Sequence, residues 1–162
     1  MKLSVVILAA GKGQRMCSAL PKVMHKVGGV PMLERVVQTA TQLDPVKIYV
    51  VHGNGVSPMR QQLKHLPVQW IEQSQRLGTG HAVRQVMDHV PGDHMLLVLY
   101  GDVPLVEVNT LLQLRHNTPK QGVGVVVAKT SNPAGFGRIV RDEMGHITAI
   151  VEHKDATDEQ RK

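Results

Sequence analysis

Cysteine is nearly absent from this sequence of 162 residues, which contains only Cys17. A single cysteine excludes an internal disulfide and is typical of a reducing compartment. The nine histidines show no H-E-x-x-H or similar spacing, so no histidine-built metal site is predicted. No apolar run approaches the ~18 residues of a membrane span, and Met1-Lys2 leads directly into the first expected strand, leaving no room for a signal peptide. These absences predict a soluble, cytoplasmic protein without a membrane partner.

Aromatic residues are also scarce, at 2% of the chain, so the 42% of hydrophobic residues predict an aliphatic core. The formal net charge of +6 favours anionic partners. However, the basic residues are dispersed, and the few aromatic side chains do not alternate with them as base-stacking platforms would. A small anionic ligand therefore fits the composition better than a nucleic acid, which is the weaker alternative.

The most informative stretch is residues 3–22. Residues 3–10 form an uncharged apolar run, which fits a strand buried on both faces. The sequence G-K-G-Q-R follows at residues 11–15, and a glycine loop with cations at a strand end suits a polyphosphate. The P-loop motif is absent, and Met16 stands where a dinucleotide fingerprint needs its third glycine. The stretch predicts a phosphate-binding loop, and the alternative is a tight turn with solvated cations.

Strand-like and helical patterns alternate along the rest of the chain. Strands are expected at 3–10, 46–51, 68–71, 95–100, 123–129, 138–142 and 146–152, with a small hairpin or turn at 23–30 and helices at 31–43, 59–66, 80–88 and 106–117. This order predicts an α/β fold with a three-layer, mostly parallel Rossmann-like sheet and helices on both faces. Residues 152–162 are mostly charged and add no final element, so the chain is expected to be a fragment.

Two further groups lie where α/β sheets bind ligands. Asp102 follows the apolar strand at 95–100 and is suited to hold Mg²⁺, although one carboxylate is not a complete site. The alternative is that Asp102 only caps the following helix. Gln73 offers a donor and an acceptor to a base edge, beside Gly78 and Thr79 at an expected helix N-terminus. Ordinary capping by Thr79 is the alternative there.

Several segments together resemble a known family. They are L-A-A-G-K-G-Q-R-M (8–16), L-P-K (20–22), Gln73 with L-G-T-G-H-A (77–82), Y-G-D-V-P-L (100–105), G-F-G-R-I (135–139) and I-V-E-H-K-D-A (150–156). They resemble the nucleotidyltransferase superfamily of sugar-phosphate pyrophosphorylases. Within it they are similar to the N-terminal domain of the bacterial bifunctional N-acetylglucosamine-1-phosphate uridyltransferases/glucosamine-1-phosphate acetyltransferases. The resemblance covers nearly the whole chain and implies one nucleotidyltransferase domain over 1–162, truncated at its C-terminal side.

The resemblance implies that N-acetylglucosamine 1-phosphate attacks the α-phosphorus of UTP, giving UDP-N-acetylglucosamine for peptidoglycan and lipopolysaccharide synthesis, and pyrophosphate. Arg15 and Lys22 would stabilise the phosphates, and Asp102 would bind Mg²⁺. The implied substrate-binding residues are Leu8, Ala9, Ala10, Gly11, Gln73, Gly78 and Thr79 around uridine, Tyr100 and Gly101 along the nucleotide-sugar, and Gly137 and Glu152 at the sugar and its N-acetyl group. Lys22 and Asp102 are also counted among the substrate-binding residues.

Members of this family continue well beyond residue 162. They supply an asparagine as a second magnesium ligand, and a left-handed β-helix that carries the acetyltransferase activity and assembles trimers. The 162 residues are therefore expected to bind uridine nucleotide weakly, to turn over slowly or not at all, and to lack acetyltransferase activity; their oligomeric state is not predicted. The alternatives are a thymidylyl-, guanylyl- or cytidylyltransferase, and a non-catalytic nucleotide-sugar-binding module.

Overall fold

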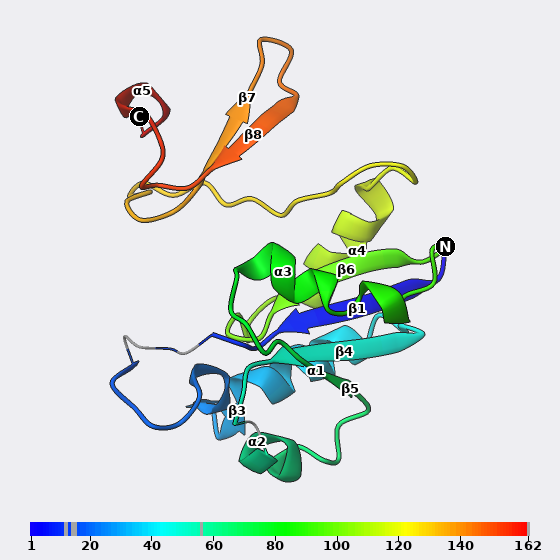
Figure 1. Cartoon of the computed structure of the whole chain (residues 1–162). Coiled ribbons are helices and arrows are strands. Elements are labelled where there is room, and N and C mark those ends of the chain that lie inside the picture. The colour runs from blue at the N-terminus through cyan, green and yellow to red at the C-terminus, as the bar shows by residue number, and fades with distance from the viewer. Residues whose placement is uncertain (12, 14–15, 56, 162) are drawn as a thin grey trace. The chain divides into compact units, whose positions relative to one another are not determined.

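The computed structural model describes residues 1–11, 13, 16–55 and 57–161 (Figure 1). The chain divides into two compact units, Met1–Gly122 and Val123–Lys162. Most of the regular secondary structure belongs to the first unit. No helix in the described part of the chain is both long and apolar enough to cross a membrane.

The first unit is built on a four-stranded sheet with the strand order β5-β4-β1-β6. All three strand pairs are parallel, and Val5 of the inner strand β1 lies opposite Ile48 on one side and Leu97 on the other. The strands are β1 (Leu3–Leu8), β4 (Lys47–His52), β5 (Gln69–Glu72) and β6 (Met95–Tyr100). The four strands expected between residues 3 and 100 and their parallel arrangement are confirmed.

Helices cover both faces of this sheet (Figure 1). Val5 and Ile7 of β1 belong to one buried cluster with Leu33 of α1 (Met32–Thr41) and Leu111 of α4 (Val108–Asn117). Val6 belongs to a second cluster with Ala82 of α3 (Thr79–Arg84). Because successive residues of a strand point to opposite faces, α1 and α3 lie on opposite sides of the sheet. The predicted three-layer α/β architecture is thereby confirmed.

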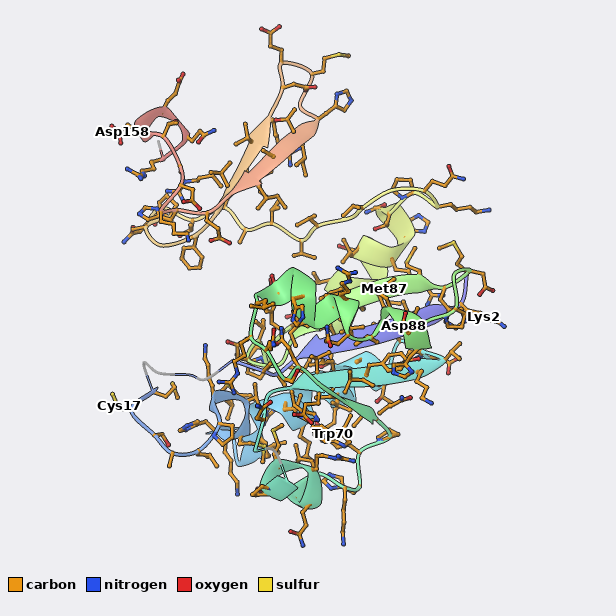
Figure 2. All side chains as sticks on the ribbon, in the orientation of Figure 1. Lys2, Cys17, Trp70, Met87, Asp88 and Asp158 are labelled. Atoms are coloured by element: carbon orange, nitrogen blue, oxygen red, sulfur yellow. The ribbon has the colours of Figure 1, made fainter. Side chains whose placement is uncertain are left out.

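Shorter elements connect these layers. They are η2 (Lys22–Met24), β2 (Lys26–Val27), β3 (Val30–Pro31), α2 (Ser57–Gln62) and η3 (Met87–His89). The antiparallel β2–β3 pair is the small hairpin expected at residues 23–30. Cys17 lies exposed on the segment between β1 and η2 (Figure 2).

Buried polar groups of the sheet find partners. The hydroxyl oxygen of Ser4 lies 2.8 Å from Nδ1 of His94. The Tyr49 hydroxyl donates a hydrogen bond to the carbonyl oxygen of His89 at 2.6 Å. Burial raises the pKa of the Tyr49 phenol, so this hydroxyl keeps its proton and remains a donor at neutral pH.

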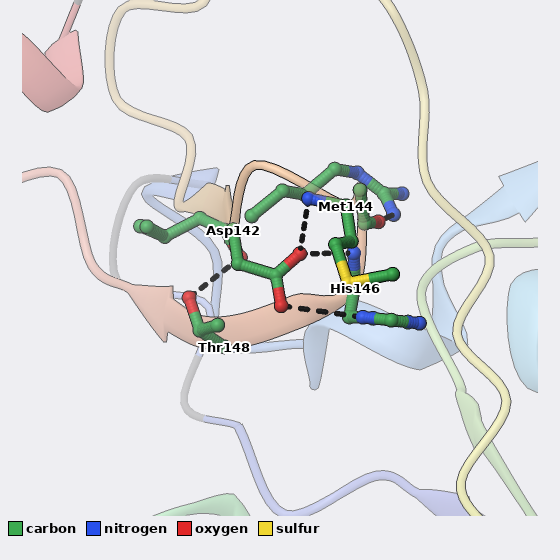
Figure 3. A network of polar contacts seen from close by, with 7 residues as sticks. Asp142, Met144, His146 and Thr148 are labelled. Carbon is green, nitrogen blue, oxygen red and sulfur yellow. Dashed lines mark hydrogen bonds and ion pairs between the residues drawn. The ribbon is translucent and has the colours of Figure 1, made fainter.

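The second unit contains the antiparallel hairpin of β7 (Arg138–Arg141) and β8 (Ile147–Val151), followed by α5 (Asp158–Arg161). Asp142 organises the turn of the hairpin (Figure 3). Its Oδ1 accepts hydrogen bonds from the backbone N–H groups of Met144 at 3.0 Å and His146 at 2.8 Å. Gly145 adopts a φ of +84°, a conformation that favours glycine. The tight turn expected at Met144-Gly145 is confirmed.

Four expectations about the elements are wrong. Residues 152–162 were expected to add no final element, but Asp158–Arg161 form the short helix α5. Residues 123–129 do not form a strand. A β-branched run needs a partner strand, and no strand pairs with this run in the part of the second unit that is described, so Val123 is 88% exposed. Thr79 is the first residue of α3 and not its N-cap, because the chain turns into the helix at Gly78, with a φ of +102°. The helix ends at Arg84 and η3 follows, where one longer helix to residue 88 was expected.

Candidate active site

A pocket of about 290 Å³ opens at the C-terminal end of the sheet in the first unit. Leu8 and Tyr100 end β1 and β6, and Gln73 directly follows β5. The lining residues are Leu8, Ala10, Gly11, Lys22, Val23, Gln73, Arg76, Gly78, Thr79, Ala82, Tyr100 and Asp102. The carboxyl ends of parallel strands are where open α/β sheets bind ligands. The pocket thus gathers residues from three stretches that the sequence singled out.

The other site residues that the sequence predicted do not line this pocket in the described part of the chain. Ala9 and Gly101 are buried and do not line the pocket. Arg15 lies outside the described residues. Gly137 and Glu152 belong to the second unit, where they flank the paired residues Arg138 and Val151 at the open end of the β7–β8 hairpin. The structure therefore brings Gly137 and Glu152 beside each other.

Three lining residues, Val23, Arg76 and Ala82, were missed by sequence reasoning. Arg76 packs against Gly53, where the absence of a side chain makes room for its guanidinium group. Arg76 follows Gln73 by three residues, but the position of an arginine in the sequence does not indicate that its side chain reaches the pocket.

The charged centre of the pocket is the ion pair of Lys22 and Asp102. Lys22 Nζ lies 2.6 Å from Asp102 Oδ2. Lys22 opens the short helix η2, and Asp102 lies in the turn after β6, where Gly101 donates its N–H to the carbonyl oxygen of Leu8 at 2.9 Å. The side chains are 36% and 30% exposed, so water reaches the pair and screens it, which leaves both groups able to exchange partners.

Asp102 does not cap the following helix. Helix α4 begins at Val108, and its N-cap residue is Glu107. The capping alternative for Asp102 is therefore wrong, and its carboxylate is available to the pocket.

The groups around Asp102 fit a metal ion that is bound jointly by the protein and a substrate better than one that is bound by protein side chains alone. Within the described ranges, no group of three or more His, Cys, Asp or Glu side chains is arranged to hold a metal ion. Lys22 contacts Oδ2, whereas Oδ1 has no hydrogen-bond partner among the residues that are described. Mg²⁺ often binds through one or two carboxylates and takes its remaining ligands from substrate phosphates and water. A lone carboxylate beside a lysine suits that arrangement.

Gln73 forms the other side of the pocket and is only 3% exposed. Its backbone N–H donates to the carbonyl oxygen of His52 at 2.7 Å, which continues the β4–β5 pairing. Its side-chain Nε2 donates to the carbonyl oxygen of Gly78 at 3.1 Å and lies 3.0 Å from Nδ1 of His81. The amide is therefore held in place before any ligand arrives.

The family model of the MobA-like NTP transferase domain matches residues 5–159. The chain belongs to this family. Over all 162 residues it is 57% identical to the "Bifunctional protein GlmU" of Coxiella burnetii (strain CbuK_Q154) and spans 36% of the length of that relative. The family match and this relative identify a nucleotidyltransferase enzyme.

Solved structures share the fold of this NTP transferase domain. A putative glucose-1-phosphate thymidylyltransferase from Bacillus anthracis, in complex with a sucrose, superposes with a TM-score of 0.74 at 23% identity, over 93% of this chain and 64% of that one. Rv0371c from Mycobacterium tuberculosis H37Rv, in complex with manganese, gives a TM-score of 0.60 at 18% identity, over 72% of this chain and 59% of that one. The likeness to the thymidylyltransferase confirms the nucleotidyltransferase fold.

Proposed function

We propose that this chain carries the uridylyl-transfer site that joins UTP and N-acetylglucosamine 1-phosphate, giving UDP-N-acetylglucosamine and pyrophosphate. One observation carries the proposal: a single pocket holds the Lys22–Asp102 pair, suited to phosphates and a metal ion, and the fixed amide of Gln73, suited to a base. The family match supports nucleotidyl transfer. The 57% identity to a GlmU protein and the motifs shared with bifunctional uridyltransferases support UTP and the amino sugar as substrates.

The chain's own residues act by positioning and by charge. The Lys22 ammonium group exchanges Asp102 for phosphate oxygens of the nucleotide, which frees the carboxylate to hold a divalent cation. Bound there, Mg²⁺ supplies neutralisation of the charge that develops on the α-phosphate and the leaving pyrophosphate. No covalent intermediate with the chain is needed, because holding two reactants in line lowers the barrier by ~7–11 kcal/mol.

Other residues complete the proposed site. Gln73 and the backbone around Gly78 and Thr79 contact uracil. Tyr100, which is 53% exposed at the end of β6, borders the nucleotide-sugar. Arg15 is assigned to the phosphates on its sequence position alone. The remaining assignments are Leu8, Ala9, Ala10 and Gly11 to the uridine, Gly101 to the nucleotide-sugar, and Gly137 and Glu152 to the sugar and its N-acetyl group.

Both units are proposed to belong to one nucleotidyltransferase domain, because the family match extends across both of them. The chain spans 36% of the length of its relative, which favours a second candidate, a nucleotide-sugar-binding fragment with no turnover of its own. Acetyl transfer to glucosamine 1-phosphate is not expected from these residues, since the resemblance assigns it to a separate β-helix domain.

Synthesis and binding measured together test the proposal. The intact mass of the chain is verified. Formation of the nucleoside diphosphate derivative of N-acetylglucosamine is then measured with UTP, TTP, CTP or GTP, first with Mg²⁺ and then with EDTA. We expect slow, magnesium-dependent synthesis with UTP preferred at least about tenfold, the effect of one good polar contact to the base. UTP binding without synthesis supports the binding fragment. Preference for another triphosphate, or no UTP binding, contradicts the proposal.

Gly13→Ala is expected to weaken UTP binding about tenfold by displacing Lys22. Gly13 has a φ of +60°, and an added Cβ would lie 2.6 Å from Cβ of Lys22, so the lysine backbone has to shift. A lost charge-assisted hydrogen bond gives an effect of that size. Isothermal titration with UTP measures it. Gly92→Ala is the matched control, because an added Cβ there meets nothing within 4 Å. Equal affinities in the two variants would contradict this role of Gly13.

A further inference from the structure

His81 contacts the proposed base-reading residue and has no part in the function described so far. It lies on α3, and its Nδ1 is 3.0 Å from Nε2 of Gln73. Its other ring nitrogen, Nε2, is 3.3 Å from Nε2 of Gln85. The imidazole therefore lies between two amide groups, that of Gln73 at the pocket and that of Gln85 at the C-cap of α3.

The surroundings of Gln73 fix the orientation of its amide. The carbonyl oxygen of Gly78 can only accept a hydrogen bond, so the group 3.1 Å from it has to be the NH₂ of Gln73. The second amide hydrogen then points to Nδ1 of His81. With both hydrogens engaged, the Gln73 carbonyl oxygen Oε1 remains, and it has no partner among the described residues. Gln73 thus presents an acceptor to the pocket that it lines.

This orientation requires a lone pair on Nδ1 of His81. A neutral imidazole accepts at one nitrogen and donates from the other, so the ring cannot accept from Gln73 and Gln85 at once. The Gln73 contact is shorter and belongs to a buried side chain, for which a missing partner costs more. The proton of His81 therefore lies on Nε2. The Gln85 amide donates to the carbonyl oxygen of His81 at 3.3 Å, so its 3.3 Å contact with Nε2 of the ring is not a hydrogen bond.

We infer that His81 is a positioning residue that selects the nucleobase by holding Gln73 with its carbonyl oxygen toward the ligand. This inference rests on the proposed function, because it takes Gln73 as the base reader. An acceptor pairs with the N3–H of uracil. Cytosine carries an unprotonated N3 at that place, so its lone pair meets the lone pair of Oε1. His81 thereby favours UTP over CTP, although it touches neither.

The test combines a ligand-free and a ligand-bound measurement on the 162-residue chain at pH 8. Long-range ¹H–¹⁵N correlation spectra report the imidazole tautomer, and the proton of His81 is expected on Nε2. Titrations with UTP and CTP then give the selectivity. We expect His81→Leu to lower the UTP:CTP affinity ratio about tenfold, as for a buried polar group that loses a partner. His81→Asn, whose Oδ1 can replace the lone pair of Nδ1, is expected to restore the ratio to within about threefold of wild type.

Gln85→Met is the matched control and is expected to leave the ratio unchanged. A proton on Nδ1 of His81, or an unchanged ratio in His81→Leu, overturns the inference. Equal losses for UTP and CTP in His81→Leu also overturn it, since they indicate a purely structural role, and His81→Asn decides the matter if the leucine variant does not fold. Absence of UTP binding by the wild-type chain overturns the proposed function and the base selection together, while the tautomer still decides whether His81 orients Gln73.

Discussion

Asp102→Asn is expected to reduce uridylyl transfer at least about a hundredfold, the size of effect seen when one group that stabilises developing charge is removed. The substitution keeps the shape of the side chain and removes its charge. Lys22 then loses its anionic partner, and a divalent cation loses the only carboxylate that lines the described part of the pocket. UTP binding is expected to be partly retained, because Gln73 and Gly78 are untouched.

Two readouts check this result. Turnover is measured as UDP-N-acetylglucosamine formed with Mg²⁺. The magnesium dependence of UTP affinity is measured by titration with Mg²⁺ or EDTA, and it does not need turnover. The tightening by Mg²⁺ that is expected in the wild type should disappear in Asp102→Asn. The control is Asp88→Asn, an exposed carboxylate on η3 (Figure 2). Magnesium dependence that survives in Asp102→Asn would contradict the assignment of the metal to this residue.

Ile7→Ala is expected to lower the free energy of unfolding by about 2–5 kcal/mol, the usual cost of truncating a buried isoleucine. Ile7 is completely buried, and in β1 it lies between Val50 of β4 and Leu99 of β6. The cavity left by the truncated side chain lies in the middle of the sheet, where neighbouring strands on both sides limit relaxation. Urea denaturation followed by circular dichroism and by the fluorescence of Trp70, the sole tryptophan, measures the loss.

Leu105→Ala is the matched control for this core substitution. Leu105 is 73% exposed, so its truncation is expected to change stability by less than about 0.5 kcal/mol. If Ile7→Ala costs no more than Leu105→Ala, β1 is not the centre of the stable core.

The sequence predicted a strand correctly where the run of residues was enough to indicate that neighbouring strands would cover it. Residues 95–100 carry no charge and are apolar except for the hydroxyl of Tyr100, and such a run is typical of a strand buried in a parallel sheet. Residues 123–129 are also largely apolar and contain four valines, which favour a strand. A strand also needs a hydrogen-bonded partner, and the sequence of the run does not show whether it has one. The preference of residues 123–129 for extended backbone was recognised, but their lack of a partner strand was not.

In the candidate site, too, some features could be predicted from the sequence and others could not. Asp102 and Gln73 were singled out because they follow strands, and the ends of parallel strands meet at one edge of the sheet. The contact of Lys22 with Asp102 and that of His81 with Gln73 depend on side-chain directions, which spacing does not encode. Arg76 was missed for this reason, since its place at the pocket depends on the room left by Gly53.

The position of β1 in the middle of the sheet has a consequence for how the chain is made. β1 leaves the ribosome before both of its neighbours, and its Leu3 pairs with Met95 in β6. At about 5–20 residues per second, roughly 5–20 seconds pass before that partner is synthesised. During this interval the apolar strand has at most one neighbour and exposes backbone groups that attract other unpaired strands. Until β6 has emerged, β1 of the nascent chain is therefore open to pairing with strands of other unfolded chains.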